Sequence, residues 1–212
     1  MVNKLKLNPG SYSGSYKVIG VELCFDFANT VSWRNRENPH EWLNSFENLS
    51  IWCQLVGILD EYQSKQLIDH LTDTEKTASQ VLLPLYELRE AIFRIFTSIA
   101  DNEDPLEKDI AYLNDFSKEK IQKQKVVYNK GEFTLVRSKK RSSFDKILHE
   151  IYDSVIYVMT HIDLTRIKKC TSCEWLFHDI SRNRSRRWCV MEDCGNRNKV
   201  NSFNKRQRKL QL

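Results

Sequence analysis

Residues 170–197 read CTSCEWLFHDISRNRSRRWCVMEDCGNR and contain four cysteines in two close pairs. Two residues separate Cys170 from Cys173, and four residues separate Cys189 from Cys194. A C-x2-C turn brings two sulfurs onto one ion, and a second close pair completes the tetrahedral thiolate shell that structural zinc prefers. The spacing therefore predicts one structural Zn²⁺ held by all four cysteines, with no open coordination position for catalysis.

The segment between the two cysteine pairs is predicted to form a hairpin. Residues 174–179 (EWLFHD) are predicted as a strand, residues 181–185 as a turn and residues 186–190 as the returning strand, with a helix from about Arg197. A ligand turn, a hairpin and a second ligand pair at a helix start are typical of a treble-clef-like finger. Such a module has too little apolar surface to fold alone, so zinc would contribute about 10 kcal/mol or more to its folding.

Two other uses of cysteine are weighed against zinc. A redox dithiol usually has one C-x-x-C near a βαβ unit, which this sequence lacks. His178 follows Cys173 by five residues and could replace one cysteine ligand, although a hydrogen bond to Asp179 is the simpler interpretation. Cys24 and Cys53 lie in apolar runs and are interpreted as small core residues.

The basic residues are concentrated in the same part of the chain. Residues 166–212 contain 13 Lys and Arg against 4 Asp and Glu, a net charge of +9, whereas residues 1–165 contain 20 against 24, a net charge of −4. Arg bridges phosphates and reads guanine edges, so we expect duplex DNA as the partner. In the predicted helix, Val200 and Phe203 are expected to face the finger. The candidate DNA contacts are Arg182, Arg184, Arg186, Arg187, Arg197, Lys199, Lys205 and Arg206.

The first 165 residues show mainly the apolar spacing of helices. Trp42 and Trp52 are expected in the core, and Pro84 either starts a new helical segment or bends a continuous helix. Asp104-Pro105 predicts a helix start. The other expected helices cover residues 41–56, 62–71, 75–100 and 142–163.

The predicted fold class is mainly α (α+β). Residues 125–136 place Asn-Lys-Gly between β-branched and aromatic residues, which indicates a β-hairpin. We therefore expect a helical domain over residues 1–165 with one β-hairpin, followed by a small treble-clef-like zinc finger over residues 166–212.

Three polar residues accompany the apolar run of residues 18–27, which is predicted as a short strand or the start of a buried helix. If buried, Asp26, Asn29 and Thr30 must hydrogen-bond one another or nearby backbone, as in a turn or a helix cap. The alternative is contact with a small-molecule effector. These three residues are the candidates for that ligand site.

The motifs Trp175-Leu176-Phe177, Arg186-Arg187-Trp188-Cys189 and Cys194-Gly195-Asn196-Arg197, together with Cys170 and Cys173, resemble the CGNR zinc-finger domain of bacterial proteins. Residues 23–30 (LCFDFANT), with Leu49 and Trp52 downstream, resemble the ABATE domain usually placed before that finger. The resemblance implies a stress-related transcription regulator whose finger binds zinc through the four cysteines and binds DNA. It also implies that Arg186, Arg187 and Arg197 match the basic positions of that finger.

Together these features predict a cytoplasmic, DNA-binding transcription regulator. Residues 1–165 would sense a small-molecule effector or form a homodimer. The alternative is an RNA- or ribosome-binding zinc protein, in which Trp175, Phe177, Trp188 and Phe203 would stack on bases. An enzyme is not expected, because the sequence shows no nucleophile–base pair, phosphate loop or open metal site. No membrane segment is expected, because no run approaches the roughly 18 apolar residues of a membrane helix.

Overall fold

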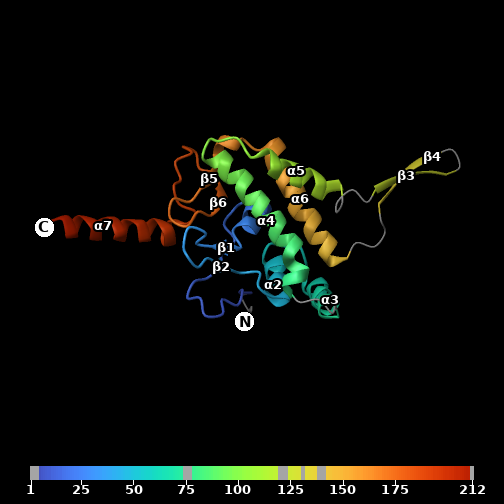
Figure 1. Ribbon diagram of the computed structural model, residues 1–212, viewed down its shortest axis with the longest axis horizontal. Helices are drawn as coiled ribbons and strands as arrows, with labels where there is room; N and C mark the ends of the chain where they lie inside the picture. The colour runs from blue at the N-terminus through green and yellow to red at the C-terminus, as the bar shows by residue number, and fades with distance from the viewer. Residues whose placement is uncertain (1–4, 74–77, 119–123, 130–131, 138–141, 211–212) are drawn as a thin grey trace.

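The computed structural model describes residues 5–73, 78–118, 124–129, 132–137 and 142–210, with only the backbone for residues 79, 124–129, 132–137, 205 and 208–210. Helices dominate it (Figure 1), which confirms the predicted mainly α class. The helices are α1 (Leu23–Ala28), α2 (Phe46–Leu55), α3 (Glu61–Thr72), α4 (Ala78–Ala100), α5 (Glu107–Phe116), α6 (Ser143–His161) and α7 (Asn196–Leu210). Within the described residues the strands form three antiparallel pairs: β1 (Val31–Ser32) with β2 (His40–Glu41), β3 (Gln124–Asn129) with β4 (Glu132–Arg137), and β5 (Ile167–Lys169) with β6 (Leu176–His178).

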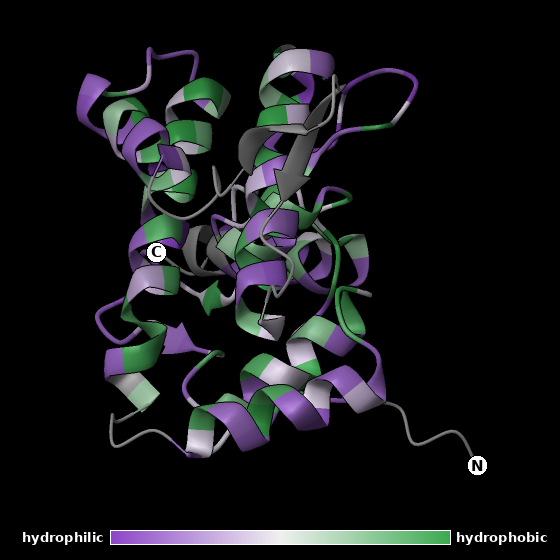
Figure 2. Cartoon of the chain, turned by 90° about the vertical axis from the view of Figure 1, so that its right-hand side faces the viewer, coloured by the Kyte–Doolittle hydropathy of each residue, from purple (hydrophilic) through white to green (hydrophobic). Residues whose placement is uncertain are grey.

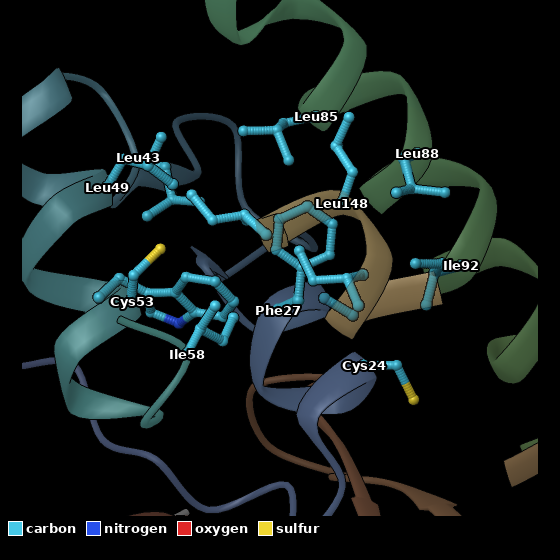
Figure 3. Close-up of a cluster of buried hydrophobic side chains, with 14 of the residues drawn as sticks. Cys24, Phe27, Leu43, Leu49, Cys53, Ile58, Leu85, Leu88, Ile92 and Leu148 are labelled. Atoms are coloured by element: carbon cyan, nitrogen blue, oxygen red, sulfur yellow. The ribbon is translucent and has the colours of Figure 1, made fainter. Parts of the chain in front are cut away.

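The short helix α1 lies against both α4 and α6 and is almost entirely buried. Phe25 and Phe27 have no exposed surface, and in Figure 3 Phe27 lies among leucines of other helices, including Leu49 and Leu148. Full burial of two phenylalanines contributes several kcal/mol of hydrophobic stabilisation. The apolar run over residues 18–27 therefore ends in a core helix, which decides between the two predicted alternatives.

Side-chain caps fix where several helices begin. The Ser45 hydroxyl accepts a hydrogen bond at the start of α2. Asp60 and Gln63 form a reciprocal capping box at α3, and Ser142 and Asp145 form another at α6. Each cap satisfies backbone N–H groups that have no partner inside the helix and stabilises it by about 1 kcal/mol.

Helix α4 runs without interruption through Pro84, so the proline lies inside one helix. Leu85, Leu88 and Ile92 are completely buried at helical spacing, and this packing offsets the backbone hydrogen bond that Pro84 cannot donate. Figure 2 shows hydrophobic and hydrophilic residues alternating along the helices, as expected when each helix has one face on a core.

Four side chains expected in the core are confirmed there. Trp42, Trp52, Cys24 and Cys53 have no exposed surface. Burial raises the pKa of the Cys24 thiol to about 12, since a thiolate would lose its hydration there. Both core cysteines therefore stay protonated and chemically inert at neutral pH.

The pairing of β6 differs from the prediction. Leu176–His178 do form a strand, but their partner is β5, which precedes the Cys170–Cys173 turn. Residues 186–190 form no strand, so the predicted returning strand is wrong. Strand β6 therefore pairs with the strand that precedes the Cys170–Cys173 turn, because Asp179 holds residues 181–186 as a compact loop.

The helical part and the cysteine-containing part share a hydrophobic core. Ile167 of β5 and Leu176 of β6 belong to the same buried cluster as the core of the helices. Phe177 points into a second cluster with the cysteines, which Tyr16 and Ile19 of the N-terminal segment partly cover. The domain boundary between residues 165 and 166 stays a prediction. Strand β5 follows that boundary but packs in the same core as the helices that precede it.

Helix α7 projects away from the rest of the molecule (Figure 1). Val200 and Phe203 are 57% and 54% exposed, so the expectation that they face the finger is wrong. The helix continues past the finger, and its middle therefore has no apolar surface beside it. Among the described residues, no helix is both long enough and apolar enough to cross a membrane.

Candidate metal centre and nucleic-acid interface

The four cysteines converge from two local structures. Cys170 and Cys173 lie in the turn between β5 and β6, which is closed by hydrogen bonds from Cys170 N–H to the Trp175 carbonyl (2.8 Å) and from Glu174 N–H to the Cys170 carbonyl (2.9 Å). Cys189 precedes a five-residue π-helical turn, Met191–Gly195, that contains Cys194 and leads directly into α7. The metal ligands thus fix the base of the projecting helix.

The geometry of these sulfurs fits a metal ion. All four Sγ atoms lie within 4.8 Å of one another, and all four side chains are buried. Hydrogen bonding with the Cys170 sulfur raises the pKa of Cys173 and of Cys189, because it stabilises the protonated thiol of the donor. A bound dication would replace these protons and stabilise four thiolates, the soft donors that select zinc.

His178 takes no part in the cysteine cluster. Its Nδ1 lies 2.9 Å from Oε1 of Glu22, which precedes α1, and not beside Asp179 as the sequence suggested. Asp179 instead accepts hydrogen bonds from the backbone N–H groups of Ser181 and Arg186, both at 3.0 Å. One buried carboxylate thereby closes residues 181–186 into a loop, which we call the arginine loop.

Several predicted DNA-contact residues have partners inside the protein. Arg184 pairs with Asp163 at 3.1 Å. The half-buried Arg186 donates to the Cys189 carbonyl at 2.6 Å. The Arg187 guanidinium lies 5.6 Å from the ring centre of Trp188. These contacts hold the loop side chains in place beside the metal ligands.

The remaining candidates lie at the loop tip and on α7. Arg182, Lys199 and Arg206 are exposed, whereas the side chain of Lys205 lies outside the described residues. Arg197 is exposed too, but its guanidinium lies 4.5 Å from the ring centre of Trp33, in the loop that follows β1. The structure thus places the predicted residues on two surfaces: the arginine loop and α7.

Two family models match the chain. The model described as "CGNR zinc finger" matches residues 166–207. The ABATE model, described as "Putative stress-induced transcription regulator", matches residues 22–127. The chain belongs to the ABATE family. No curated protein matches it. The CGNR match and the cysteine cluster together identify the site of one structural zinc ion.

The ABATE part, by which we mean the described residues before residue 166, is joined to the finger through hydrogen bonds between side chains and main chain. Asn29, just after α1, donates from Nδ2 to the Leu176 carbonyl and accepts from the Leu176 N–H, both at 2.8 Å. The Asn29 side-chain amide thereby bonds Leu176 of β6 in the way that the backbone of a neighbouring strand would. Trp175 Nε1 also donates to the Val31 carbonyl at 3.0 Å. The finger is therefore fixed to the ABATE part by buried, directional contacts.

Asp26 and Thr30 also have partners within the ABATE part. Asp26 Oδ1 accepts hydrogen bonds from the N–H groups of Ile19 (2.8 Å) and Gly20 (2.7 Å). Burial nevertheless raises the Asp26 pKa to about 6. Thr30 Oγ1 donates to the Phe27 carbonyl at 2.7 Å. The turn-and-cap interpretation thus accounts for these groups, and contact with an effector stays a prediction.

Two residues at the contact between the ABATE part and the finger were not predicted from the sequence. Trp33 adopts a left-handed backbone conformation (φ 59°), and its Nε1 donates to the Tyr12 hydroxyl at 2.6 Å. Lys17 forms a salt bridge with Asp193, one residue before a zinc ligand. In the sequence, a tryptophan next to polar residues resembles any half-buried aromatic residue. Its neighbours in the sequence do not indicate its long-range partner.

Proposed function

We propose that this ABATE protein is a DNA-binding transcription regulator whose zinc finger presents α7 and the arginine loop to duplex DNA. The observation that carries the proposal is α7 itself, whose sequence NRNKVNSFNKRQRKL contains six Lys and Arg and no acidic residue. A helix of that composition gains little from packing on its own protein. Its surface is suited to a polyanion.

The dimensions of α7 suit the major groove. A 15-residue helix is about 22 Å long and about 10–12 Å wide, which matches a groove about 12 Å wide. Its polar residues are Asn, Gln, Ser, Arg and Lys, side chains that pair with base edges. The exposed Phe203 supplies an apolar surface of the kind that contacts thymine methyl groups.

The arginine loop supports the same proposal as a phosphate-binding surface. Arg182 in the loop and Arg187 directly after it are exposed, and the loop is closed by Asp179 on a finger that zinc makes rigid. Such a fixed loop can orient the finger on the backbone, whereas α7 would read the bases. Useful specificity would need two copies, so the proposed regulator would act as a homodimer on paired half-sites.

The proposal makes the protein a binding protein rather than an enzyme, and a regulator of this kind would work in the cytoplasm. RNA or ribosome binding through the same cations is the alternative. A regular, projecting helix favours duplex DNA, because side chains cannot read the deep and narrow major groove of A-form RNA.

Fluorescence anisotropy with a labelled mixed-sequence duplex, titrated at several salt concentrations, tests the proposal. Lys199→Gln with Arg206→Gln should lower the salt slope by about 2, because two phosphate contacts release about two fewer counterions. Lys65→Gln with Lys108→Gln, two exposed cations on α3 and α5, is the matched control and should leave the slope unchanged.

Equal losses in the two double variants would show that only net charge matters and would overturn the role of α7. Competition with a structured RNA of equal length completes the test. Preferential displacement of the duplex by RNA would replace the DNA proposal with the RNA alternative.

A further inference from the structure

A cavity of about 280 Å³ lies where the ABATE part meets the finger. On the ABATE side it is lined by residues 12–15 and by Lys17 and Trp33, and on the finger side by Trp175, Asp193 and Arg197. Cys173, Cys189 and Cys194 also border it. The cavity thus touches the ABATE part, the metal centre and the first turn of α7 together.

Part of the cavity lining is aromatic. Tyr12, Trp33 and Trp175 line the cavity, and the Trp33–Tyr12 hydrogen bond ties two of them together. Trp33 holds a positive φ, which is unfavourable for a bulky side chain and must be held by its surroundings. Backbone strain of this kind is concentrated at ligand sites and switch regions. These rings provide apolar walls for a flat ligand.

Two cations also line the cavity. Arg197 forms a cation–π contact with Trp33, with its guanidinium carbon 4.5 Å from the ring centre, and the structure gives its guanidinium no carboxylate partner among the described residues. Lys17 is 43% exposed at its side chain and pairs with the equally accessible Asp193. A guanidinium held in this way presents its N–H groups to a planar anion.

We propose that this cavity binds a small aromatic carboxylate, with the ring against Tyr12 and Trp175 and the carboxylate beside Arg197. The volume admits a compact molecule of one or two rings. Asp26, Asn29 and Thr30, the candidates from the sequence, do not line this cavity.

The ligand site would also couple the ABATE part to α7, a consequence that rests on the proposed function. Arg197 is the second residue of α7, and its contact with Trp33 joins the two parts across the cavity. A carboxylate that binds Arg197 competes with or strengthens that contact. Such a ligand changes DNA affinity only by as much as its own affinity differs between free and DNA-bound protein.

Binding is tested on the zinc-loaded, full-length protein without DNA. Benzoate is the probe, titrated by calorimetry and by tryptophan fluorescence, and a dissociation constant near 1 mM is expected for so small a ligand. Benzamide has the same ring without the charge and should bind at least about tenfold more weakly, since a charge-assisted hydrogen bond contributes roughly 1.5–3 kcal/mol. Inorganic phosphate should not compete.

Arg197→Gln should weaken benzoate binding about tenfold, whereas Arg206→Gln, further along the same helix, should not change it. Gly14→Ala tests the cavity without altering charge, because a methyl group there would lie 2.2 Å from the Tyr12 ring and displace it. That variant should also weaken benzoate binding while zinc content stays full.

Failure to saturate with benzoate, or equal binding of benzamide, would overturn the carboxylate site. Unchanged affinity in both Arg197→Gln and Gly14→Ala would place the ligand elsewhere and would equally overturn it. Because these titrations contain no DNA, they remain informative if the proposed DNA binding fails. Repeating the duplex titration with saturating benzoate then measures the coupling alone.

Discussion

The two ends of the CGNR finger are held very differently. At one end, β6 and the arginine loop are fastened by Asn29, by the buried carboxylate of Asp179 and by the packing of Leu176. At the other end, α7 leaves the zinc site and carries its side chains into solvent. The finger thus separates a supporting surface, which is apolar and hydrogen-bonded, from a contacting surface, which is cationic and free.

Loss of a metal ligand should disrupt the structure of both ends of the finger at once. Cys189→Ser is expected to remove zinc and unfold residues 166–210, because zinc binding supplies about 10 kcal/mol or more to such a module. Zinc content and circular dichroism measure this. Cys53→Ala, a change at a buried cysteine outside the cluster, should keep one zinc per chain. Full zinc in Cys189→Ser would show that the ligand set is wrong.

Removing the side-chain amide of Asn29 should distinguish the supporting end of the finger from the contacting end. Asn29→Ala leaves the Leu176 N–H and carbonyl without their partner, and the loss of two buried hydrogen bonds should cost roughly 2–6 kcal/mol of unfolding free energy. Asn201→Ala makes the same change on exposed α7 and should cost less than about 0.5 kcal/mol. Urea unfolding compares the two. Similar losses would contradict the assignment of support to one end.

A smaller, pH-dependent effect is expected from Asp26. Its pKa rises from 3.8 to about 6 on folding because burial disfavours the charged form, so the folded protein binds a proton that the unfolded chain releases. Stability from this group is therefore complete below about pH 4 and falls by about 3 kcal/mol as pH rises past 6.

Asp26→Asn keeps an acceptor for the Ile19 and Gly20 N–H groups and removes the titration. The difference in unfolding free energy between wild type and Asp26→Asn, measured from pH 4 to 8, should change by about 2.5 kcal/mol. Other carboxylates contribute equally to both proteins and cancel. A flat difference curve would show that Asp26 titrates normally.

The sequence predicted the metal centre because zinc ligands are determined by short spacings. Cys170 and Cys173 form a local turn, and the preference of zinc for four thiolates then completes the set. The helix start at Ser142 was similarly local, since the cap and its N–H partner lie three residues apart. The helix predicted over residues 41–56 instead begins at Phe46, after the cap at Ser45.

The partners of β6 could not be predicted in the same way. An apolar and polar alternation identifies a strand but not its neighbour, so residues 186–190 were predicted as the partner, whereas the structure pairs β6 with β5. The contact between Trp33 and Arg197, and that between Asn29 and Leu176, join residues far apart in sequence. Helical spacing likewise placed Val200 and Phe203 on a common face but could not show that the finger ends before them.

The bond between Asn29 and Leu176 also sets an order of events during synthesis. The two residues are 147 positions apart, so a ribosome adding about 5–20 residues per second makes the second roughly 7–30 s after the first. Until then the nascent ABATE part carries an amide without its main-chain partner and an apolar patch without Leu176. The last segment to emerge therefore closes the first one made, and a truncated chain would expose that patch to aggregation or to chaperones.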